Sequence, residues 1–475
     1  MSMGALYFAT LSVLLICITV SSYAQAPSSC SSTLTPTNSI KPSIVQGYKV
    51  DLVATGLSKP RSLQFDKAGN LLVLEQNRGV SSLQLQDDGG TCVRVKSKKT
   101  IIESHGLNHG LALSQDGMTL YGSDQEAVYS WDYDPEQASV SPDNKTLING
   151  MTGSDHTTRT LLIPERVSGM LLVSRGSASN IDIDAESLDS GISQIRAFNL
   201  RNMTSMPYDY ARDGLRLGWG LRNSVGVVEH PDTGGIYSVE NSVDEITRDG
   251  KDIHEDNPGE EMNFHGYLNG TEYTPQGTNY GYPYCFAAWG VDDIPNNGNL
   301  SVGSNFAIGQ QNNTINDSYC AEQTPPRLSF QAHMAPLDIK FNNSASEAWV
   351  TFHGSWDRTE PSGYKLSVIP FANGEPVARP DNNTSYTDIL TNEQNSACPD
   401  HCFRPVGIAI SQDGRLFMSS DASGEIYVIA REQGAASTRQ GSSGAPTGKT
   451  SDGGRNLVTS KYAITFATFA IFFLA

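Results

Sequence analysis

The sequence predicts an all-β fold, a six-bladed β-propeller whose blades are four-stranded antiparallel sheets. No stretch keeps a helical apolar period over several turns, and short β-type runs bounded by turn residues dominate. A unit made of an apolar strand, a turn and a second apolar strand recurs six times. The starts of these units are separated by 49, 50, 64, 113 and 69 residues. Such periods suit propeller blades with loop insertions better than a solenoid or a sandwich.

The six units define where each blade is expected to begin. They start at Pro60, His109, Arg159, Asn223, Pro336 and Pro405. The wide gap after the fourth unit has room for a seventh blade, but its aromatic, Gly and Pro content favours long loops. The segment "YKVDLVATGL" from Tyr48 is expected to pair with the last blade and close the ring, which removes a free sheet edge.

Both ends of the chain carry apolar segments that are typical of targeting signals. The first is followed by small residues at Ala24 and Ala26, which fit a signal-peptidase site. The second, "YAITFATFAIFFLA", is too short for a transmembrane helix of about 20 residues and follows a polar spacer, which favours a glycosyl-phosphatidylinositol (GPI) attachment signal. The expected organisation is a signal peptide (1–26), an extension (27–47), the propeller (48–431), a Ser/Gly-rich stalk (432–454) and a removed GPI signal (455–475). We therefore expect a secreted protein that is held at the cell surface, on the outer membrane leaflet or cell wall.

Composition fits an extracellular protein. The net charge of -18 argues against a nucleic-acid partner, since such binding relies on clustered Lys and Arg. Nine glycosylation sequons fit a glycosylated exterior: Asn144, Asn202, Asn269, Asn299, Asn312, Asn316, Asn342, Asn382 and Asn383. Six cysteines follow the signal peptide, and their order suggests the pairs Cys30–Cys92, Cys285–Cys320 and Cys398–Cys402. Spacing alone leaves about 15 pairings open.

Histidines and arginines gather at the positions just before the recurrent hairpins. In a propeller these positions face the mouth of the central channel. They are occupied by Arg61, His109, His156, Arg222, Asn223, His333 and Arg404. Inward-facing arginines need anionic partners, which are either the chain's own carboxylates or a bound polycarboxylate.

The pair Asp155-His156 offers a general base with a neighbouring carboxylate. On an extended strand adjacent side chains point to opposite faces, so spacing alone does not place Asp155 in the same site. The acidic segment Asp252–Glu261 is either a calcium ligand set or a solvated loop. No G-x-S-x-G elbow supports an α/β-hydrolase, and no G-x-G-x-x-G indicates a nicotinamide or flavin site.

Several motifs together resemble the soluble quinoprotein glucose/sorbosone dehydrogenases, in particular their fungal pyranose dehydrogenase-like branch. They are "DHTTRTL", "LRNSVGV", "SVENSVDEITRDGKDIHEDNPGEEMN", "NYGYPYCF", "FHGSWDR" and "FRPVGIAISQDG", in this order between about Tyr48 and Ile429. The resemblance implies a six-bladed propeller that holds pyrroloquinoline quinone (PQQ) and Ca²⁺ at the channel mouth. The implied reaction oxidises the C1 hydroxyl of aldoses or pyranoses and passes electrons to an external acceptor such as a haem protein or a copper oxygenase.

The resemblance also implies roles for individual residues. His156 is the expected base with Asp155 beside it, and Arg222 is expected to polarise the quinone carbonyl. The cofactor-binding residues that the resemblance implies are Arg222, Asn223, Arg358 and Arg404, and the calcium ligands fall near Asn241 and Ser242. His333, His109 and Arg61 are added to the expected cofactor-binding set by their positions at the channel mouth. The chain departs from the bacterial pattern at "LNHG", where Leu107 and His109 flank Asn108, and at Cys402, which stands in place of an arginine. Two rival functions remain open: a metal-dependent propeller hydrolase or lactonase, and a cell-surface binding propeller without turnover.

Overall fold

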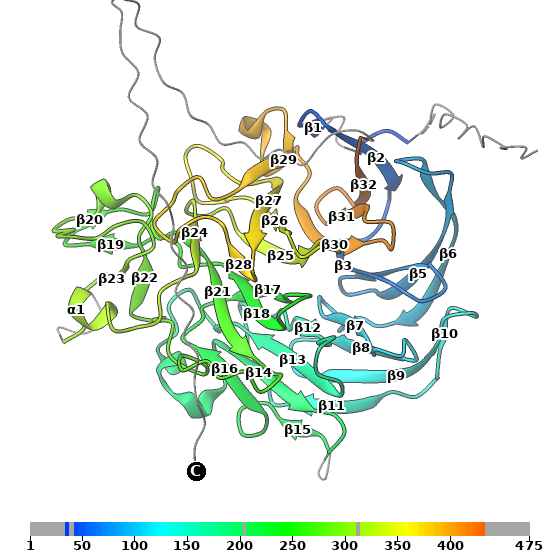
Figure 1. Cartoon of the computed structure of the whole chain (residues 1–475), viewed down its shortest axis with the longest axis horizontal. Coiled ribbons are helices and arrows are strands. Elements are labelled where there is room, and N and C mark those ends of the chain that lie inside the picture. Colours follow the sequence, from blue (N-terminus) through cyan, green and yellow to red (C-terminus); the bar gives the residue numbers. More distant parts are fainter. Residues whose placement is uncertain (1–33, 38–41, 203–205, 310–313, 433–475) are drawn as a thin grey trace, which may run out of the picture. The chain divides into compact units, whose positions relative to one another are not determined.

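Six main sheets, arranged in a ring, make up the part of the chain that the structure describes (Figure 1). This structure is a computed structural model, and it describes residues 34–37, 42–202, 206–309 and 314–432. In blades 1 to 5 the four main strands occur in chain order, and the first strand of each of the six hairpin units begins within two residues of the predicted start. The predicted six-bladed propeller is confirmed.

The first three blades follow one another between residues 60 and 219. Blade 1 contains β3 (Pro60–Phe65), β4 (Leu71–Glu75), β5 (Gly79–Asp87) and β6 (Val93–Glu103). Blade 2 contains β7 (Leu111–Leu113), β8 (Thr119–Ser123), β9 (Val128–Asp134) and β11 (Lys145–Asn149), with β10 (Ser139–Val140) beside β9 and β15 (Tyr208–Asp209) beside β11. Blade 3 contains β12 (Leu161–Leu162), β13 (Met170–Arg175), β14 (Gln194–Asn199) and β16 (Leu215–Trp219).

The remaining blades complete the ring. Blade 4 contains β17 (Ser224–Glu229), β18 (Gly235–Glu240), β21 (Glu260–Tyr267) and β24 (Leu328–Phe330). Blade 5 contains β25 (Pro336–Phe341), β26 (Glu347–Phe352), β27 (Lys365–Ala372) and β29 (Thr387–Asn392), with β28 (Glu375–Pro376) beside β27. Blade 6 contains β30 (Pro405–Ile410), β31 (Leu416–Ser420), β32 (Glu425–Arg431) and β2 (Tyr48–Ala54).

The N-terminal strand closes the ring, as predicted. β2 runs antiparallel to β32, with Tyr48 opposite Arg431. The structure extends the propeller farther upstream than the expected boundary at Tyr48, because β1 (Pro42–Ile44) pairs with β29 at the outer edge of blade 5. The end of the expected extension therefore belongs to the sheet system.

The long gap in the fourth unit is an insertion and not a seventh blade. It forms two small hairpin sheets and one short helix: β19 (Thr247–Arg248), β20 (Lys251–Asp252), β22 (Cys285–Ala287), β23 (Asn305–Ala307) and α1 (Asp317–Cys320). The disulfide Cys285–Cys320 joins β22 to α1. Four short 3-10 helices lie in loops: Ile183–Glu186, Leu188–Ser190, Val291–Asp293 and Asn395–Ala397.

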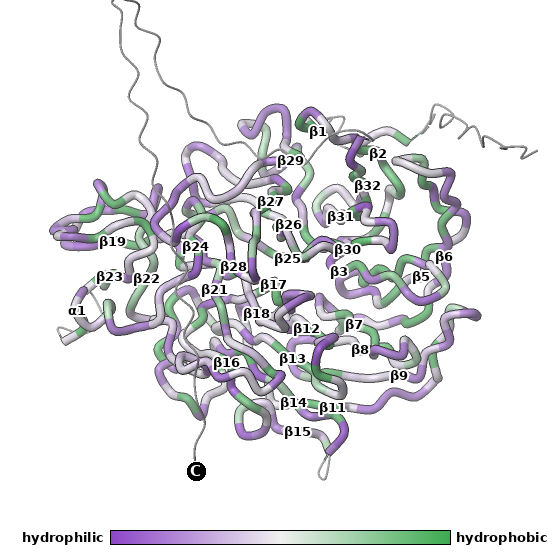
Figure 2. The backbone as a smooth tube through the Cα atoms, viewed as in Figure 1, coloured by the Kyte–Doolittle hydropathy of each residue, from purple (hydrophilic) through white to green (hydrophobic). Residues whose placement is uncertain are grey.

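The core lies between neighbouring blades, because side chains on alternate faces of each strand pack against different neighbours. In β4, Leu71 and Val73 join the apolar cluster shared with blade 6, whereas Leu72 and Leu74 join the cluster shared with blade 2. This explains why β4 is apolar at successive positions and not at every second one. Hydrophilic residues gather in the connecting loops (Figure 2).

Two further predictions concern cysteines and chain ends. The Cys398–Cys402 disulfide is present, and Cys92 is disulfide-bonded. Cys30, the signal peptide, most of the stalk and the GPI signal lie outside the described residues. Within the described part of the chain, no helix is both long and apolar enough to cross a membrane.

Candidate active site

His156 lies in the extended segment that leads into blade 3, and its ring is held by Ser177. The ring Nδ1 lies 3.1 Å from the Ser177 carbonyl oxygen and 2.9 Å from its Oγ. A carbonyl oxygen only accepts, and the Ser177 hydroxyl already donates to the Ser179 carbonyl, so Nδ1 carries the proton. Burial and then the charge of Arg222 lower the pKa of His156 to about 4, against the opposing charge of Asp155. Nε2 of a neutral His156 is therefore available as a base.

Asp155 does not perform the orienting role at the Nδ1 of His156, because Ser177 occupies that place. The Asp155 side chain is exposed to solvent, as expected for a neighbour on an extended segment. Asp155 therefore acts on His156 only through its charge and makes no hydrogen bond to the imidazole ring.

Asn223 and His156 meet because the residue between them has no side chain. A Cβ at Gly176 would lie 2.6 Å from the Asn223 Oδ1 and 2.8 Å from the His156 Cβ. The Asn223 amide nitrogen has only a long contact, 3.4 Å, with the Asn241 Oδ1, so it can donate to a ligand. The predicted neighbourhood of the His156 base and the Arg222-Asn223 pair is thus present in the geometry.

Arg222 is buried and already has several partners. Its Nε and one Nη donate to Asn180, and that same Nη lies 2.9 Å from the Asp244 Oδ2. The other Nη lies 3.4 Å from the Asn241 carbonyl oxygen. The Arg222 backbone N–H donates to the Glu240 carboxylate at 2.6 Å. Arg222 is therefore rigidly positioned, with one Nη weakly engaged.

Asn241 and Ser242, the predicted calcium ligands, follow β18 and are fixed by their neighbours. The Asn241 amide donates to the Pro336 carbonyl at 2.7 Å, and the Ser242 N–H donates to the Glu260 Oε2 at 2.7 Å. The other oxygen of Glu260 accepts the Ala335 N–H at 2.9 Å. Glu260, from the acidic segment, thus acts as a buried brace for this turn, and the Asn241 carbonyl oxygen also lies near an Nη of Arg222.

A first set of charged side chains, here called the Asp357 group, contains Arg222, Asp244, His333 and Asp357. The His333 Nδ1 lies 3.6 Å from the Asp244 Oδ1 and 3.2 Å from the Asp357 Oδ2. Burial works to lower the pKa of His333, but Asp244 and Asp357 raise it overall. Burial raises the pKa of Asp357 against the charge of His333. His333 also adopts a left-handed backbone with φ of 63°, which costs about 1 kcal/mol or more.

A second set, here called the Asp421 group, contains Arg61, His353, Arg404 and Asp421. The Asp421 carboxylate accepts from Arg61 at 2.5 Å and faces the His353 Nε2 at 2.8 Å. Burial works to raise the pKa of Asp421, but His353 and Arg61 hold it well below its usual range. The Arg404 guanidinium donates to the carbonyls of His353 and Gly354, at 3.1 and 3.0 Å, and lies over the Tyr364 ring. Among the described mouth arginines, Arg404 alone has no carboxylate partner.

Arg358 and His109 occupy different surroundings from those expected. Arg358 contacts the Asp256 Oδ1 at 3.2 and 3.3 Å, so the acidic segment supplies its anionic partner. His109 is 3 % exposed, and burial followed by the charge of Arg61 lowers its pKa well below the usual value. His109 is therefore a neutral, buried residue beside Arg61.

Sequence reasoning missed Asp244, His353, Asp357 and Asp421. All four follow the second strand of a hairpin, where the resemblance pointed only to Asn241, Ser242 and Arg358. In an antiparallel hairpin the first strand begins where the second one ends. The same end of the channel therefore receives residues from both positions, and the loops after β18, β26 and β31 carried the missing signal.

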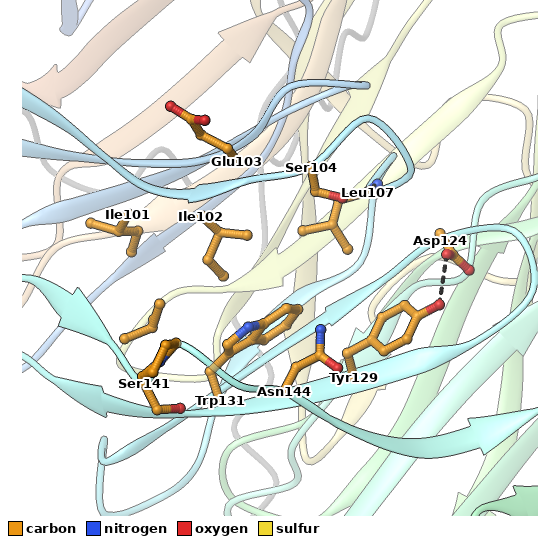
Figure 3. Close-up of a pocket in the computed structure, with 12 residues that line it drawn as sticks. Ile101, Ile102, Glu103, Ser104, Leu107, Asp124, Tyr129, Trp131, Ser141 and Asn144 are labelled. Atoms are coloured by element: carbon orange, nitrogen blue, oxygen red, sulfur yellow. Dashed lines mark hydrogen bonds between the residues drawn. The ribbon is translucent and has the colours of Figure 1, made fainter.

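A separate hollow of about 490 Å³ lies between blades 1 and 2 (Figure 3). Ile101, Ile102 and Leu107 face the rings of Tyr129 and Trp131 across it. None of the predicted site residues lines this hollow. Its Asp124 accepts from the Tyr129 hydroxyl at 2.9 Å and from backbone N–H groups of its own turn, so the carboxylate is structural.

Comparison with known proteins identifies the family to which the chain is similar. Residues 42–432 match the TrAA12-like family. The chain is 46% identical over 410 residues to a pyrroloquinoline quinone-dependent sugar dehydrogenase of Hypocrea jecorina, covering 84% of this chain and 93% of the relative. It is 34% identical over 412 residues to a pyrroloquinoline quinone-dependent pyranose dehydrogenase of Coprinopsis cinerea, covering 82% of this chain and 55% of that protein.

Two solved structures of related proteins are similar to this chain over most of its length. A calcium structure of an AA12-family enzyme of Trichoderma reesei is 48% identical, with a TM-score of 0.80 and coverage of 82% of this chain and 97% of the other. The holo form of the PQQ domain of the Coprinopsis cinerea pyranose dehydrogenase is 34% identical, with a TM-score of 0.77 and the same two coverages.

Proposed function

Because this chain belongs to the TrAA12-like family, we propose that it is a PQQ-dependent dehydrogenase that oxidises the C1 hydroxyl of an aldose or pyranose. The observation that carries this proposal is the pairing of a neutral His156, whose Nδ1–H is fixed by Ser177, with the nearby Arg222-Asn223 pair. The two named relatives, a sugar and a pyranose dehydrogenase, support the same substrate class.

The described residues fit the quinone and its calcium ion. PQQ carries three carboxylates, and Arg404 offers a guanidinium whose described partners are carbonyl oxygens and an aromatic ring. Arg61 and the weakly engaged Asn223 amide offer further donors. The carbonyls of Asn241 and Ser242 would hold Ca²⁺, which prefers oxygen ligands.

The chain's own contribution to the reaction is proton removal and orientation. Nε2 of His156 accepts the proton of the sugar C1 hydroxyl, while the C1–H electron pair leaves as hydride. The bound quinone supplies the two-electron acceptor for that hydride. The product is the lactone, and the Arg222 guanidinium would supply positive charge to stabilise the charge that the reduced cofactor gains.

The test is reconstitution of the purified protein with PQQ and Ca²⁺, followed by dye reduction with a panel of aldoses. We expect a spectral change, a higher melting temperature and turnover, since a ligand that binds only the native state raises stability. Absence of both the spectral change and the stabilisation would falsify the proposal. The same preparation without quinone is assayed on lactones, because a propeller hydrolase would hydrolyse them in a chelator-sensitive way.

We further propose that the protein is secreted, glycosylated and tethered by a GPI anchor, and that an external haem protein or copper oxygenase reoxidises the quinone. The support is the pair of apolar terminal segments and the nine sequons. Release of the protein from intact cells by phosphatidylinositol-specific phospholipase C tests the anchor. Retention on the membrane after full digestion would argue for another mode of attachment.

A further inference from the structure

Asp357 is a buried carboxylate that has no hydrogen-bond donor among the residues that the structure describes. Its side chain is 3 % exposed, and both carboxylate oxygens lack a hydrogen-bond partner. Buried polar groups in folded proteins nearly always have partners, and an unpaired buried charge costs several kcal/mol, on the order of the desolvation penalty of one ion. The contact with the His333 Nδ1 at 3.2 Å does not meet hydrogen-bond geometry. A proton on the His333 ring offsets part of this charge, and a cation bound between His333 and Asp357 would balance it more fully.

His333 presents the arrangement of a metal-binding imidazole. Its Nε2 lies 2.5 Å from the His254 carbonyl oxygen. A carbonyl only accepts, so Nε2 carries a proton and Nδ1 is the nitrogen that faces Asp244 and Asp357. Metal-bound histidines usually donate their second ring N–H to a carbonyl or carboxylate in this way. Asp244 is oriented likewise, because its other oxygen accepts from Arg222 at 2.9 Å.

The spacing of the three groups matches a coordination sphere. One ligand atom from each of Asp244, His333 and Asp357 lies within 4.8 Å of the others. With metal–ligand distances of about 2.0–2.2 Å, two ligands of a tetrahedral ion lie roughly 3.4 Å apart. The two separations from the His333 Nδ1, 3.6 and 3.2 Å, bracket that value.

We propose that Asp244, His333 and Asp357 bind a divalent transition-metal ion, with Zn²⁺ as the best fit, through side-chain atoms that are distinct from the main-chain carbonyls of Asn241 and Ser242 expected to hold Ca²⁺. One imidazole and two carboxylates suit Zn²⁺, whereas Ca²⁺ takes six to eight oxygen ligands. The site lies beside the proposed quinone pocket but does not depend on the quinone. Three protein ligands leave at least one coordination position for water or another small ligand.

The ion would join two blades through their loops. Asp244 follows β18 of blade 4, whereas His333 precedes β25 and Asp357 follows β26 of blade 5. Bound metal therefore adds stability that is lost on chelation, and it fixes Asp244 against Arg222 from the opposite side.

The test compares three forms of the purified, quinone-free protein: wild type, Asp357→Asn, and Asp292→Asn. The control removes the same charge at an exposed position in the insertion. Titration calorimetry with Zn²⁺ should give one tight site in wild type and the control, and binding weaker by about 100-fold or more in Asp357→Asn. Mn²⁺ should bind the same site more weakly, in line with the order of divalent affinities.

Melting temperatures provide a second test of Zn²⁺ binding that also reports whether Asp357→Asn is folded. In EDTA, Asp357→Asn should be at least as stable as wild type, since it removes an unpaired buried carboxylate. Zn²⁺ should raise the melting temperature of wild type and leave that of Asp357→Asn unchanged, while the response of both to Ca²⁺ stays equal. Equal Zn²⁺ affinity in the two forms, or no Zn²⁺ binding by wild type, overturns the proposal. Both readings are taken without quinone and sugar, so they are independent of the dehydrogenase assay.

Discussion

The Asp421 group and the Asp357 group use the same residue types with opposite charge balance. In each, one aspartate contacts an arginine and a histidine: Asp421 with Arg61 and His353, and Asp244 with Arg222 and His333. The Asp421 group adds a second arginine, Arg404, and the Asp357 group adds a second carboxylate. The loop between β26 and β27 contributes to both groups, through His353 and Asp357.

Both groups contain an Arg–Asp–His set, and the fourth charged residue in each determines whether the group suits an anionic or a cationic ligand. Arg404 leaves an excess of positive charge beside Asp421, which suits a carboxylate of the quinone. Asp357 adds a second carboxylate beside His333 and Asp244, which suits a cation. One channel end can thus hold an anionic cofactor and a metal ion close together.

The largest effect is expected for the substitution of His156, which belongs to neither group. This substitution tests proton transfer without changing the charged residues of either group. In the reconstituted enzyme, His156→Ala should lower kcat by about 10²–10⁴-fold, because a general base contributes this much. Quinone affinity, followed by melting temperature, should change little. A kcat equal to that of wild type would remove His156 from the reaction.

Arg404 and Arg358 test whether carboxylate pairing decides which arginine binds the quinone. Arg404→Gln should weaken PQQ binding by about 10- to 100-fold, since a hydrogen bond to a charged group contributes about 1.5–3 kcal/mol. Arg358→Gln should have a much smaller effect, because Asp256 already neutralises Arg358. Quinone titrations monitored by absorbance compare the two variants. Equal losses of PQQ affinity in the two variants would show that pairing with a carboxylate does not decide which arginine binds the quinone.

The pH dependence follows from the neutral state of His156. Its pKa is lowered to about 4, so the base stays deprotonated at neutral pH and kcat/KM should fall only as the pH approaches 4. The unfolded histidine takes up its proton near pH 6.5, so the contribution of His156 to stability is present above that value and declines as the pH falls towards 4. A rate profile with a pH-insensitive dye checks the first point. A limb near pH 6.5 would show that the ring is not desolvated during turnover.

The smallest effect is expected for Asp155→Asn. The Asp155 side chain is exposed and Ser177 orients the imidazole, so kcat should change by about twofold or less, as for an exposed charge pair. The measurement is kcat under the conditions used for His156→Ala. A loss comparable with that of His156→Ala would restore Asp155 to the catalytic machinery.

The repeat in the sequence was sufficient to predict the ring, its closure by Tyr48–Ala54 and the starts of all six blades. Strand alternation and turn residues are local properties, and they survive in the folded protein. The partners within the site were harder to predict, because Asp357 and Asp421 acquire meaning only when distant loops meet. Arg61 and Arg358 were identified from the sequence as site residues. The carboxylates that neutralise them lie 360 and 102 positions away along the chain, so the sequence did not show these pairings.

The closing sheet also sets an order of events during synthesis. Tyr48 and Arg431 are 383 positions apart, so β2 leaves the ribosome long before its partner β32 exists. Loop closure over such a span is slow, and an unpaired strand edge invites contact with other chains. The propeller can therefore close only after its last strand, β32, has been made. A chain cut before Glu425 would keep β2 as an unpaired strand edge that can associate with other chains.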